Sequence, residues 1–333
     1  MIELSAKAVS HPNIAFIKYW GNRDSSLRIP VNGSISMNMA ELETITTVTF
    51  TPSLSADQLT LNGKKADPGQ VQRVTDFLDI IRKMAGFNFF ADVVSTNNFP
   101  TGAGIASSAA AFSALALAGS KAAGLELDEK TLTRLARRGS GSASRSIPDG
   151  FVEWLPGSTD EDSYSISLAS ASSWDLRDVI AVVAADEKKT GSSEGHGLAG
   201  TSPFQTTRVA DAPRRLSICR EAIISHDFDK LSAVMELDSD MMHAVMMTST
   251  PALFYWEPAS LRIIKSVPMW RNQGIPCAYT IDAGPNVHIL CPASSKDDIS
   301  SRLSNMDGVV TVLETSAGGP ARRPGDHRAH LRY

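Results

Sequence analysis

The chain has 333 residues and a net charge of −4 at pH 7, with 42% hydrophobic and 20% charged residues. This length suits two domains of about 150 residues each, and the composition is that of a globular enzyme. Because no apolar run reaches the ~18 residues of a membrane helix and residues 1–10 lack a secretory signal pattern, we expect a cytoplasmic protein without a membrane partner. The negative charge argues against nucleic-acid binding.

The pattern of apolar residues, turn residues and helix caps predicts a mixed α+β chain in two halves that meet near 170–180. The predicted elements, in chain order, are strands and loops over 1–50 with a strand at 43–50, a helix at 67–86, a strand at 90–95, an Ala-rich helix to about 119, a helix at 128–139, strands at 151–154 and 178–184, helices at 212–226, 228–248 and 258–273, strands at 277–281 and 287–291, a helix at 295–304 and a strand at 308–314. Pro268 should kink or shorten its helix.

The helix at 67–86 has signals at both ends. Asp67 can cap its start, Pro68 fits the first helical position and Gln70 completes a capping box, while Gly86 ends it. Its predicted buried face comprises Val71, Val74, Phe77, Leu78, Ile81 and Met84.

The three cysteines are few and far apart in the sequence, and none has the spacing of a zinc site. We therefore expect free, buried thiols at Cys219, Cys277 and Cys291.

The clearest chemical signal is a Gly-rich stretch at 97–109, between a predicted strand and the Ala-rich helix. Gly102 and Gly104 let the backbone turn tightly and approach a ligand, and the N–H groups at the helix start suit an anion. Ser107 and Ser108 add hydroxyls for phosphate oxygens or a magnesium ion. The stretch lacks the Gly-Lys-Ser/Thr of a Walker loop and the third glycine of a dinucleotide fingerprint. The alternative is a helix cap on a tightly packed Gly/Ala helix.

The run Pro-Thr-Gly-Ala-Gly-Ile-Ala-Ser-Ser at 100–108 resembles the phosphate-binding loop of the galactokinase–homoserine kinase–mevalonate kinase–phosphomevalonate kinase (GHMP) superfamily, Pro-x-x-x-Gly-Leu-x-Ser-Ser. The resemblance implies ATP and Mg²⁺ as cofactors, with Ser108 as the candidate metal contact. The nucleotide-binding residues that it implies are Asn97, Pro100, Gly102, Ala103, Gly104, Ile105, Ala106, Ser107 and Ser108.

Three further segments are similar to motifs of the diphosphomevalonate decarboxylase family, in the family's order: 11–24, 137–154 and 279–286. The second contains Arg-Arg-Gly-Ser-Gly-Ser-Ala-Ser-Arg-Ser and the third is Tyr-Thr-Ile-Asp-Ala-Gly-Pro-Asn. The resemblance implies the two-domain α+β GHMP kinase fold. It places a ribosomal protein S5 domain 2-like domain at 1–175 and a ferredoxin-like domain at 176–333, and it implies a homodimer.

The family reaction implied is the ATP-dependent phosphorylation of a tertiary hydroxyl on a mevalonate phosphate, followed by loss of phosphate and carbon dioxide. This chemistry needs a group for the hydroxyl proton, and Asp282 in a Gly-Pro turn is the candidate. Lys18 is the candidate cation for the transferred phosphate, and Arg145 can hold the substrate carboxylate in a bidentate fork. The resemblance adds Tyr19, Ser140 and Ser142 as substrate contacts.

Each catalytic candidate has a structural alternative. Lys18 could be a surface charge, Asp282 could only initiate a turn, and Arg145 could pair with Asp149 or Glu153.

Asn22 stands where the family has a lysine that holds the diphosphate tail, and Asp149 adds a carboxylate nearby. Losing a charge-assisted contact weakens binding by about 1.5–3 kcal/mol. We therefore expect mevalonate 5-phosphate as the substrate and isopentenyl phosphate as the product, as in the phosphomevalonate decarboxylase branch. The alternatives are a diphosphomevalonate decarboxylase that makes isopentenyl diphosphate, a mevalonate 3-kinase without decarboxylation, and a non-catalytic nucleotide-binding protein.

Overall fold

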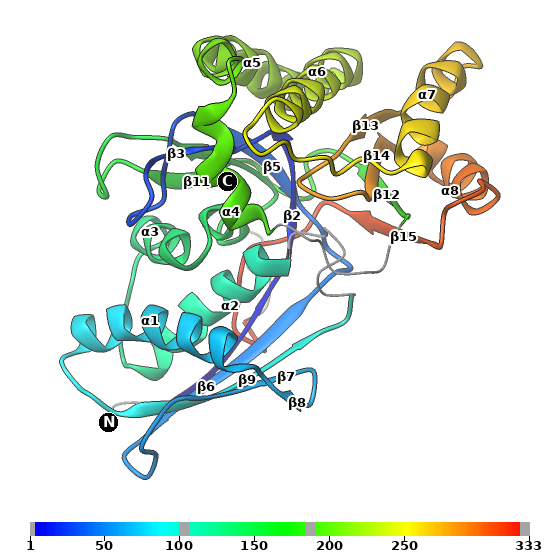
Figure 1. The fold of residues 1–333 in the computed structure, drawn as a ribbon. Helices are drawn as coiled ribbons and strands as arrows, with labels where there is room; N and C mark the ends of the chain where they lie inside the picture. The colour runs from blue at the N-terminus through cyan, green and yellow to red at the C-terminus, as the bar shows by residue number, and fades with distance from the viewer. Residues whose placement is uncertain (1–3, 100–106, 184–190, 327–333) are drawn as a thin grey trace.

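The computed structural model describes residues 4–99, 107–183 and 191–326 (Figure 1). Within these residues, no helix is both long enough and apolar enough to cross a membrane. The helices are α1 (Pro68–Ala85), α2 (Ser107–Ala122), α3 (Glu129–Gly139), α4 (Ser192–Leu198), α5 (Gln205–Ser225), α6 (Phe228–Met247), α7 (Pro258–Asn272) and α8 (Lys296–Ser304), with 3-10 turns η1 (Gly141–Ser146), η2 (Ala199–Thr201) and η3 (Ala293–Ser295). The strands are β1 (Ser5–Ser10), β2 (Asn13–Ile17), β3 (Asn22–Asp24), β4 (Ile29–Pro30), β5 (Ser34–Asn38), β6 (Thr44–Thr51), β7 (Gln58–Leu61), β8 (Lys64–Lys65), β9 (Phe90–Asn97), β10 (Phe151–Leu155), β11 (Tyr164–Ala169), β12 (Leu176–Val182), β13 (Ala278–Thr280), β14 (Val287–Pro292) and β15 (Thr311–Ser316).

The first sheet has the strand order β1-β6-β9-β7-β8, and α1 and α2 cover one of its faces (Figure 1). Buried and half-buried residues alternate along β6, as expected for a strand with one face in the core. Phe50, Leu78 and Phe112 belong to the core between sheet and helices. This packing fixes the start of α2 at Ser107, inside the predicted phosphate-loop motif at 100–108.

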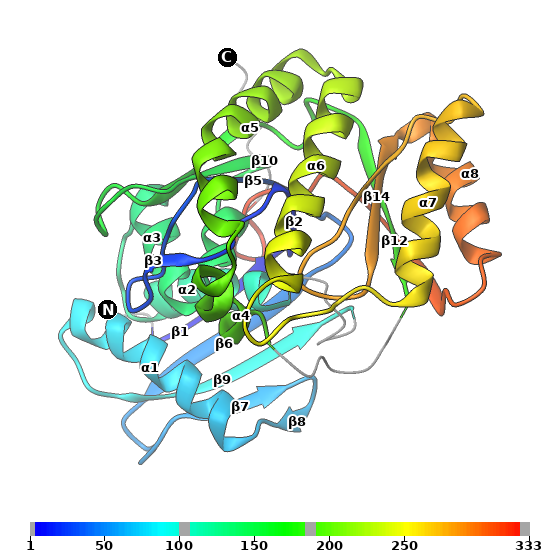
Figure 2. The same ribbon diagram turned by 45° about the horizontal axis from the view of Figure 1, so that its top comes forward.

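The second sheet has the order β11-β10-β5-β2, and α5 and α6 pack against it side by side (Figure 2). Phe16 and Met37 of the sheet share a core with Leu216 and Met235 of the helices. The same core includes residues of β12 and β14, so the apolar interior continues into the third sheet.

The third sheet is antiparallel with the order β13-β14-β12-β15, and α7 and α8 lie on its outer side (Figure 2). Val179, Ile263 and Ile289 belong to its core. The hydroxyl of Thr280 at the end of β13 donates to the carbonyl of Ala15 in β2 over 3.3 Å. The turn after β13 therefore meets the end of β2.

Helix caps explain why the predicted ends of α1 are confirmed. The Asp67 side chain accepts a hydrogen bond from the Gln70 backbone N–H over 2.9 Å, and the Gln70 side-chain oxygen accepts one from the Asp67 backbone N–H over 3.2 Å. Gly86 ends α1 with a φ of 76°. Met84 is an exception on the predicted buried face, because it is 43% exposed.

Two of the described helices contain an internal proline. α5 begins at Gln205 instead of near 212 and contains Pro213, whereas α7 agrees with the predicted helix at 258–273 and runs through Pro268 to Asn272 without ending early. A proline inside a helix costs about 3 kcal/mol. Both helices bury one face on a sheet, and this tertiary burial outweighs the local penalty.

The cysteines agree with prediction, since Cys219, Cys277 and Cys291 are buried and free. Burial raises the pKa of each thiol, to about 11 for Cys277 and about 12 for Cys291. Thiols in this state are inert at neutral pH.

Candidate active site

Lys18 and Asp282 form an ion pair although 264 positions separate them in the chain. Lys18 follows β2, and Asp282 follows β13 at the start of the turn into β14. The Lys18 Nζ lies 2.5 Å from Asp282 Oδ1. The Lys18 side chain is almost fully buried, whereas that of Asp282 is 29% exposed. Lys18 is therefore not a surface charge, and the carboxylate is open to a ligand on one side.

Burial and pairing act in opposite directions on these two groups. Burial lowers the pKa of Lys18 and outweighs the attraction of Asp282. Burial alone would raise the pKa of Asp282, but the charge and hydrogen bond of Lys18 hold this pKa below its usual value. At neutral pH Asp282 is thus a carboxylate that can accept a hydroxyl hydrogen bond.

Arg145 is buried and lies close enough for its charge to act on both Lys18 and Asp282. Its Nε, Nη1 and Nη2 donate to Ser36 Oγ, Ser34 Oγ and Asn13 Oδ1 over 2.9, 2.5 and 3.0 Å. Burial lowers its pKa to about 10, so it remains a cation at neutral pH. These contacts use three of five N–H donors, which leaves two for a ligand.

The structural alternative for Arg145 was an ion pair with Asp149 or Glu153, and within the described part of the chain this alternative is wrong. The Glu153 carboxylate instead accepts hydrogen bonds from Nε and Nη2 of Arg220, over 2.9 and 2.7 Å. No carboxylate there forms an ion pair with Arg145. A buried guanidinium held only by neutral groups is suited to an anionic ligand.

The predicted substrate contacts lie together beside the start of α2. The Ser140 hydroxyl is 3.1 Å from that of Ser108 and 3.4 Å from that of Ser142. The ring of Tyr19 packs on Gly141, where an added Cβ would lie 2.5 Å from the ring, so only glycine fits. The Tyr19 hydroxyl donates to Asn22. The structure thus links the motif at 137–154 to both the phosphate loop and the motif at 11–24.

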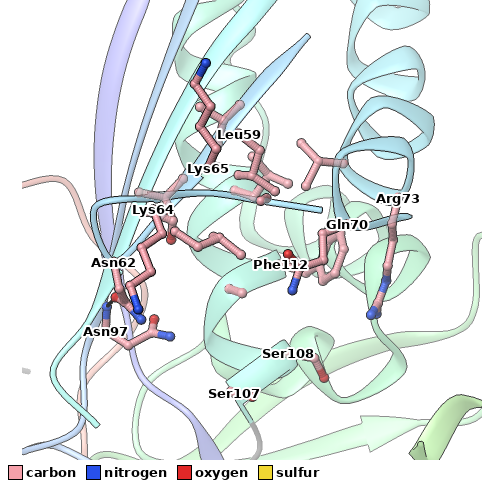
Figure 3. A pocket seen from close by; sticks show the side chains of 18 residues that line it. Leu59, Asn62, Lys64, Lys65, Gln70, Arg73, Asn97, Ser107, Ser108 and Phe112 are labelled. Carbon is pink, nitrogen blue, oxygen red and sulfur yellow. Dashed lines mark hydrogen bonds between the residues drawn. The ribbon is translucent and has the colours of Figure 1, made fainter. Parts of the chain in front are cut away.

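A pocket of about 720 Å³ opens between α1, α2 and the first sheet (Figure 3). This volume is within the usual range for small-molecule sites, about 300–1,000 Å³. Of the predicted nucleotide contacts, Asn97, Ser107 and Ser108 line it. The others lie outside the described residues: Pro100, Gly102, Ala103, Gly104, Ile105 and Ala106.

Further polar residues of the pocket were not predicted, and they include the cations Lys64, Lys65 and Arg73 and the amide Gln70. Arg73 donates to the Gly139 carbonyl over 3.0 Å and lies over the ring of Phe112, and burial lowers its pKa to about 10. Only the paired lysines were a possible signal for an anion site in the sequence. Together with Arg73, they add positive charge to a pocket whose other described lining residues are apolar or neutral.

His196 of α4 is another neighbour that the sequence pattern did not indicate. Its ring stacks on Tyr19 with a centroid distance of 4.0 Å, and its Nδ1 accepts the backbone N–H of Gly21 over 3.0 Å. Burial lowers its pKa to about 3, so it is neutral. His196 therefore supports the Tyr19 ring without adding charge.

Magnesium was predicted at Ser108. Among residues 4–99, 107–183 and 191–326, no group of three His, Cys, Asp or Glu side chains gathers to hold a metal. The Ser108 hydroxyl lies on the pocket wall, and its contact with magnesium stays a prediction.

Two family models match this chain along most of its length. Residues 10–165 match the diphosphomevalonate decarboxylase-like N-terminal domain, and residues 178–327 match the mevalonate 5-diphosphate decarboxylase C-terminal domain. The chain belongs to the diphosphomevalonate decarboxylase family. Its members therefore provide the comparison for the site described above.

Known members of the family are similar in sequence and structure. The diphosphomevalonate decarboxylase of Candida albicans is 39% identical over 328 residues, which cover 93% of this chain and 91% of that protein. Mevalonate diphosphate decarboxylase from Staphylococcus aureus matches with a TM-score of 0.91 and 39% identity, over 96% of this chain and 97% of that chain. A structure of MDDEF in complex with MVAPP, AMPPCP and magnesium matches with a TM-score of 0.90 and 38% identity, over 96% and 98%. The chain is thus a decarboxylase, and the α+β GHMP kinase fold is confirmed.

The names of these relatives specify the diphosphate. They support the diphosphate alternative and do not support the expected placement in the phosphomevalonate decarboxylase branch.

Proposed function

We propose that this decarboxylase converts mevalonate 5-diphosphate and ATP to isopentenyl diphosphate, ADP, inorganic phosphate and carbon dioxide. The Lys18–Asp282 pair carries the proposal, because it brings an ionised carboxylate and a cation together from distant parts of the chain. The buried Arg145 supplies a second cation to the same place. The names of the relatives support the diphosphate as substrate.

In the first step, the 3-hydroxyl oxygen of the substrate bonds to the γ-phosphorus of ATP while the bond to ADP breaks. Asp282 accepts the hydrogen bond of the hydroxyl and orients its oxygen, then takes the proton as the new bond forms. Its lowered pKa makes it a weak base, so orientation is its main contribution. Lys18 stabilises the negative charge that develops on the phosphoryl oxygens.

In the second step, the C3–O bond breaks and phosphate leaves with the bonding electrons. The bond between C2 and the carboxylate carbon then breaks, its electrons form the alkene, and carbon dioxide departs. The two unused N–H donors of Arg145 hold the carboxylate in line for this cleavage.

ATP would lie in the pocket of Figure 3, which fits a nucleotide in both size and lining. Ser107 and Ser108 present hydroxyls to its phosphates, and Lys64, Lys65 and Arg73 supply positive charge. Magnesium bound to ATP would neutralise charge on the phosphoryl group, with Ser108 as a candidate contact.

One assay tests the function against its alternatives. Purified protein with ATP, magnesium and mevalonate 5-diphosphate should release carbon dioxide and phosphate in equal amounts. ADP without carbon dioxide would indicate a 3-kinase, and nucleotide binding without ADP would indicate a non-catalytic protein. Either result would refute the proposal.

Mevalonate 5-phosphate is a second candidate substrate, and Asn22 favours it. This residue is neutral, and its side chain accepts a hydrogen bond from Tyr19, so it adds no cation for a second phosphate. The ratio of kcat/KM for the two substrates decides between them. A higher kcat/KM for the monophosphate would make mevalonate 5-phosphate the substrate, and the proposed site and chemistry would stay the same.

The division into domains at 175/176, the homodimer, the cytoplasmic location and the absence of a nucleic-acid partner remain predictions. Size-exclusion chromatography with light scattering tests the homodimer, and fractionation of the producing cells tests the location.

A further inference from the structure

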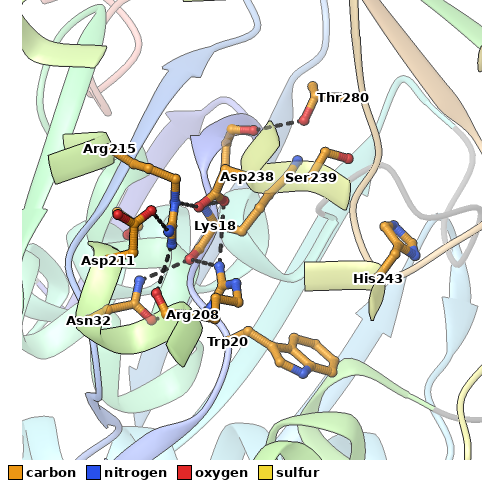
Figure 4. Close-up of polar contacts among 12 residues, drawn as sticks. Lys18, Trp20, Asn32, Arg208, Asp211, Arg215, Asp238, Ser239, His243 and Thr280 are labelled. Carbon is orange, nitrogen blue, oxygen red and sulfur yellow. Dashed lines mark hydrogen bonds and ion pairs between the residues drawn. The ribbon is translucent and has the colours of Figure 1, made fainter. Parts of the chain in front are cut away.

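Helix α6 holds the backbone of Lys18 through a buried carboxylate. Asp238 is fully buried, and its Oδ2 accepts the backbone N–H of Lys18 over 2.6 Å (Figure 4). Its Oδ1 accepts from Arg215 over 2.8 Å, and Arg208 lies 3.4 Å from Oδ2. Asp238 thereby joins α6 and α5 to the residue that follows β2.

The carbonyl of Lys18 is held by the same cluster. Arg208 donates to it over 2.8 Å, and the Asn32 side chain donates to it over 3.1 Å. Lys18 lies outside the described pairing of β2 with β5, so a sheet ladder does not fix its backbone. Side chains from α5, α6 and the segment before β5 perform that task instead.

The next residue of α6 holds the other half of the catalytic pair. Ser239 Oγ accepts the backbone N–H of Ile281, the residue before Asp282, over 3.1 Å. One turn further along, His243 Nε2 lies 3.3 Å from the Ile281 carbonyl oxygen. Ile281 follows the last residue of β13 that pairs with β14, so these contacts take the place of a ladder there.

We propose that α6 is a positioning element for catalysis, in which the adjacent residues Asp238 and Ser239 fix the position of Lys18 relative to Asp282. This inference rests on the proposed decarboxylation. A contact of 2.5 Å between Lys18 and Asp282 depends on two backbones that no common sheet ladder joins at these residues. A single rigid helix that binds both is the simplest device to keep that distance fixed.

The pH dependence of the reaction can report whether Lys18 and Asp282 keep this relative position. Lys18 from the end of β2, Arg145 from η1, His288 from β14 and His243 from α6 all act on the charge of Asp282. Lys18 is the partner that lowers the Asp282 pKa most, against the effect of burial. If Asp282 moves away from Lys18 while staying buried, its pKa rises, and the acid limb of the kcat profile moves to higher pH.

Ser239→Ala is the decisive variant, and Ser232→Ala is its matched control. Both serines are buried on α6, but the Ser232 hydroxyl donates only to its own helix at Phe228, over 2.7 Å. We expect S239A to lower kcat about tenfold, because small displacements of reacting groups have large effects on rate. The KM values for ATP and for the mevalonate phosphate should stay within about twofold, since the binding contacts remain. The acid limb should move up by about 0.5 pH unit or more in S239A and stay unchanged in S232A.

Asp238→Asn provides a second measurement, because it keeps an oxygen for the Lys18 N–H while removing the charge shared by Arg208 and Arg215. We expect a lower kcat than in the wild type. Circular dichroism and thermal unfolding establish that each variant is folded before its rates are compared.

The outcomes separate this inference from the proposed function. Wild-type protein that releases no carbon dioxide overturns the proposed function, and the inference with it. Active wild-type protein together with an S239A variant whose kcat and pH profile equal those of S232A overturns the inference alone.

Discussion

At the scale of single residues, the Lys18–Asp282 contact decides what the acid can do. An aspartate whose pKa is held below its usual value is ionised across the physiological range and binds protons weakly. Such a group orients a hydroxyl well and removes its proton only when the oxygen already bonds to phosphorus. The pair thus favours a phosphoryl transfer in which proton loss comes late.

Asp282→Asn should abolish alkene formation. The amide keeps the size of the side chain but loses the charge that pairs with Lys18, so the hydroxyl is no longer held in place by a carboxylate. It also loses the group that takes the hydroxyl proton, and this contribution by itself is worth about 10²–10⁴-fold in rate. Carbon dioxide release measures the loss, and ATP binding by calorimetry serves as the control for folding. Near-normal turnover would remove Asp282 from its proposed role.

Lys18 should set the basic limb of the pH profile. Because burial lowers its pKa, we expect kcat to fall as pH rises, at a pH below the usual lysine value of about 10.4. Lys18→Arg should move this limb upward, since the intrinsic pKa of a guanidinium, about 12.5, is higher than that of a lysine ammonium. A limb that stays in place in the arginine variant would assign the titration to another group.

Asn22→Lys should improve binding of the diphosphate more than of the monophosphate. An added cation beside Tyr19 gains a charge-assisted contact of about 1.5–3 kcal/mol, which corresponds to roughly tenfold or more in KM. Steady-state kinetics with both substrates measure the change. Equal KM changes for the two substrates would mean that position 22 does not contact the second phosphate.

Elements whose ends carry local signals could be predicted from the sequence. The capping box of α1 and the turn between β13 and β14 involve residues three or four positions apart, so a short stretch of chain contains the whole signal. The motifs that supply Lys18, Arg145 and Asp282 are equally local. α5 was predicted too short because Pro213 is unfavourable locally and is tolerated only through packing.

The contacts of α6 could not be predicted in the same way. Asp238 and Ser239 contact residues about 220 and 42 positions away, and no motif marks their own helix. Lys64, Lys65 and Arg73 likewise enter the pocket only when a hairpin and α1 assemble beside α2. Supporting residues depend on tertiary structure, whereas reacting residues of this family lie in recognisable motifs.

The helix α3 offers a test of element stability away from the reacting groups. Asp128 caps it by accepting the Thr131 backbone N–H over 2.8 Å. Asp128→Ala should lower the free energy of unfolding by about 1 kcal/mol and leave kcat unchanged. Urea unfolding measures the effect, with the exposed loop variant Glu161→Ala as a control for loss of charge. Equal stability of both variants would mean that the cap contributes nothing.

At the scale of the whole molecule, the two ends of the chain are interleaved. The core under α5 and α6 includes residues of the second and third sheets, and the backbone of Arg322 exchanges hydrogen bonds with Val9 over 2.8 and 3.0 Å. Among the described residues, those that line the pocket all belong to the first part of the chain, whereas the ion pair needs both parts.

This shared ion pair has a consequence for a split enzyme. If the chain were cut near residue 175 and the fragments made separately, one would contain Lys18 without its counter-ion and the other Asp282 without its own. Each lone charge would have to hydrate or neutralise, so neither fragment could turn over substrate. Carbon dioxide release that recovers on mixing would then measure complementation directly. Activity is regained only when the two fragments associate so that Lys18 and Asp282 form their ion pair again.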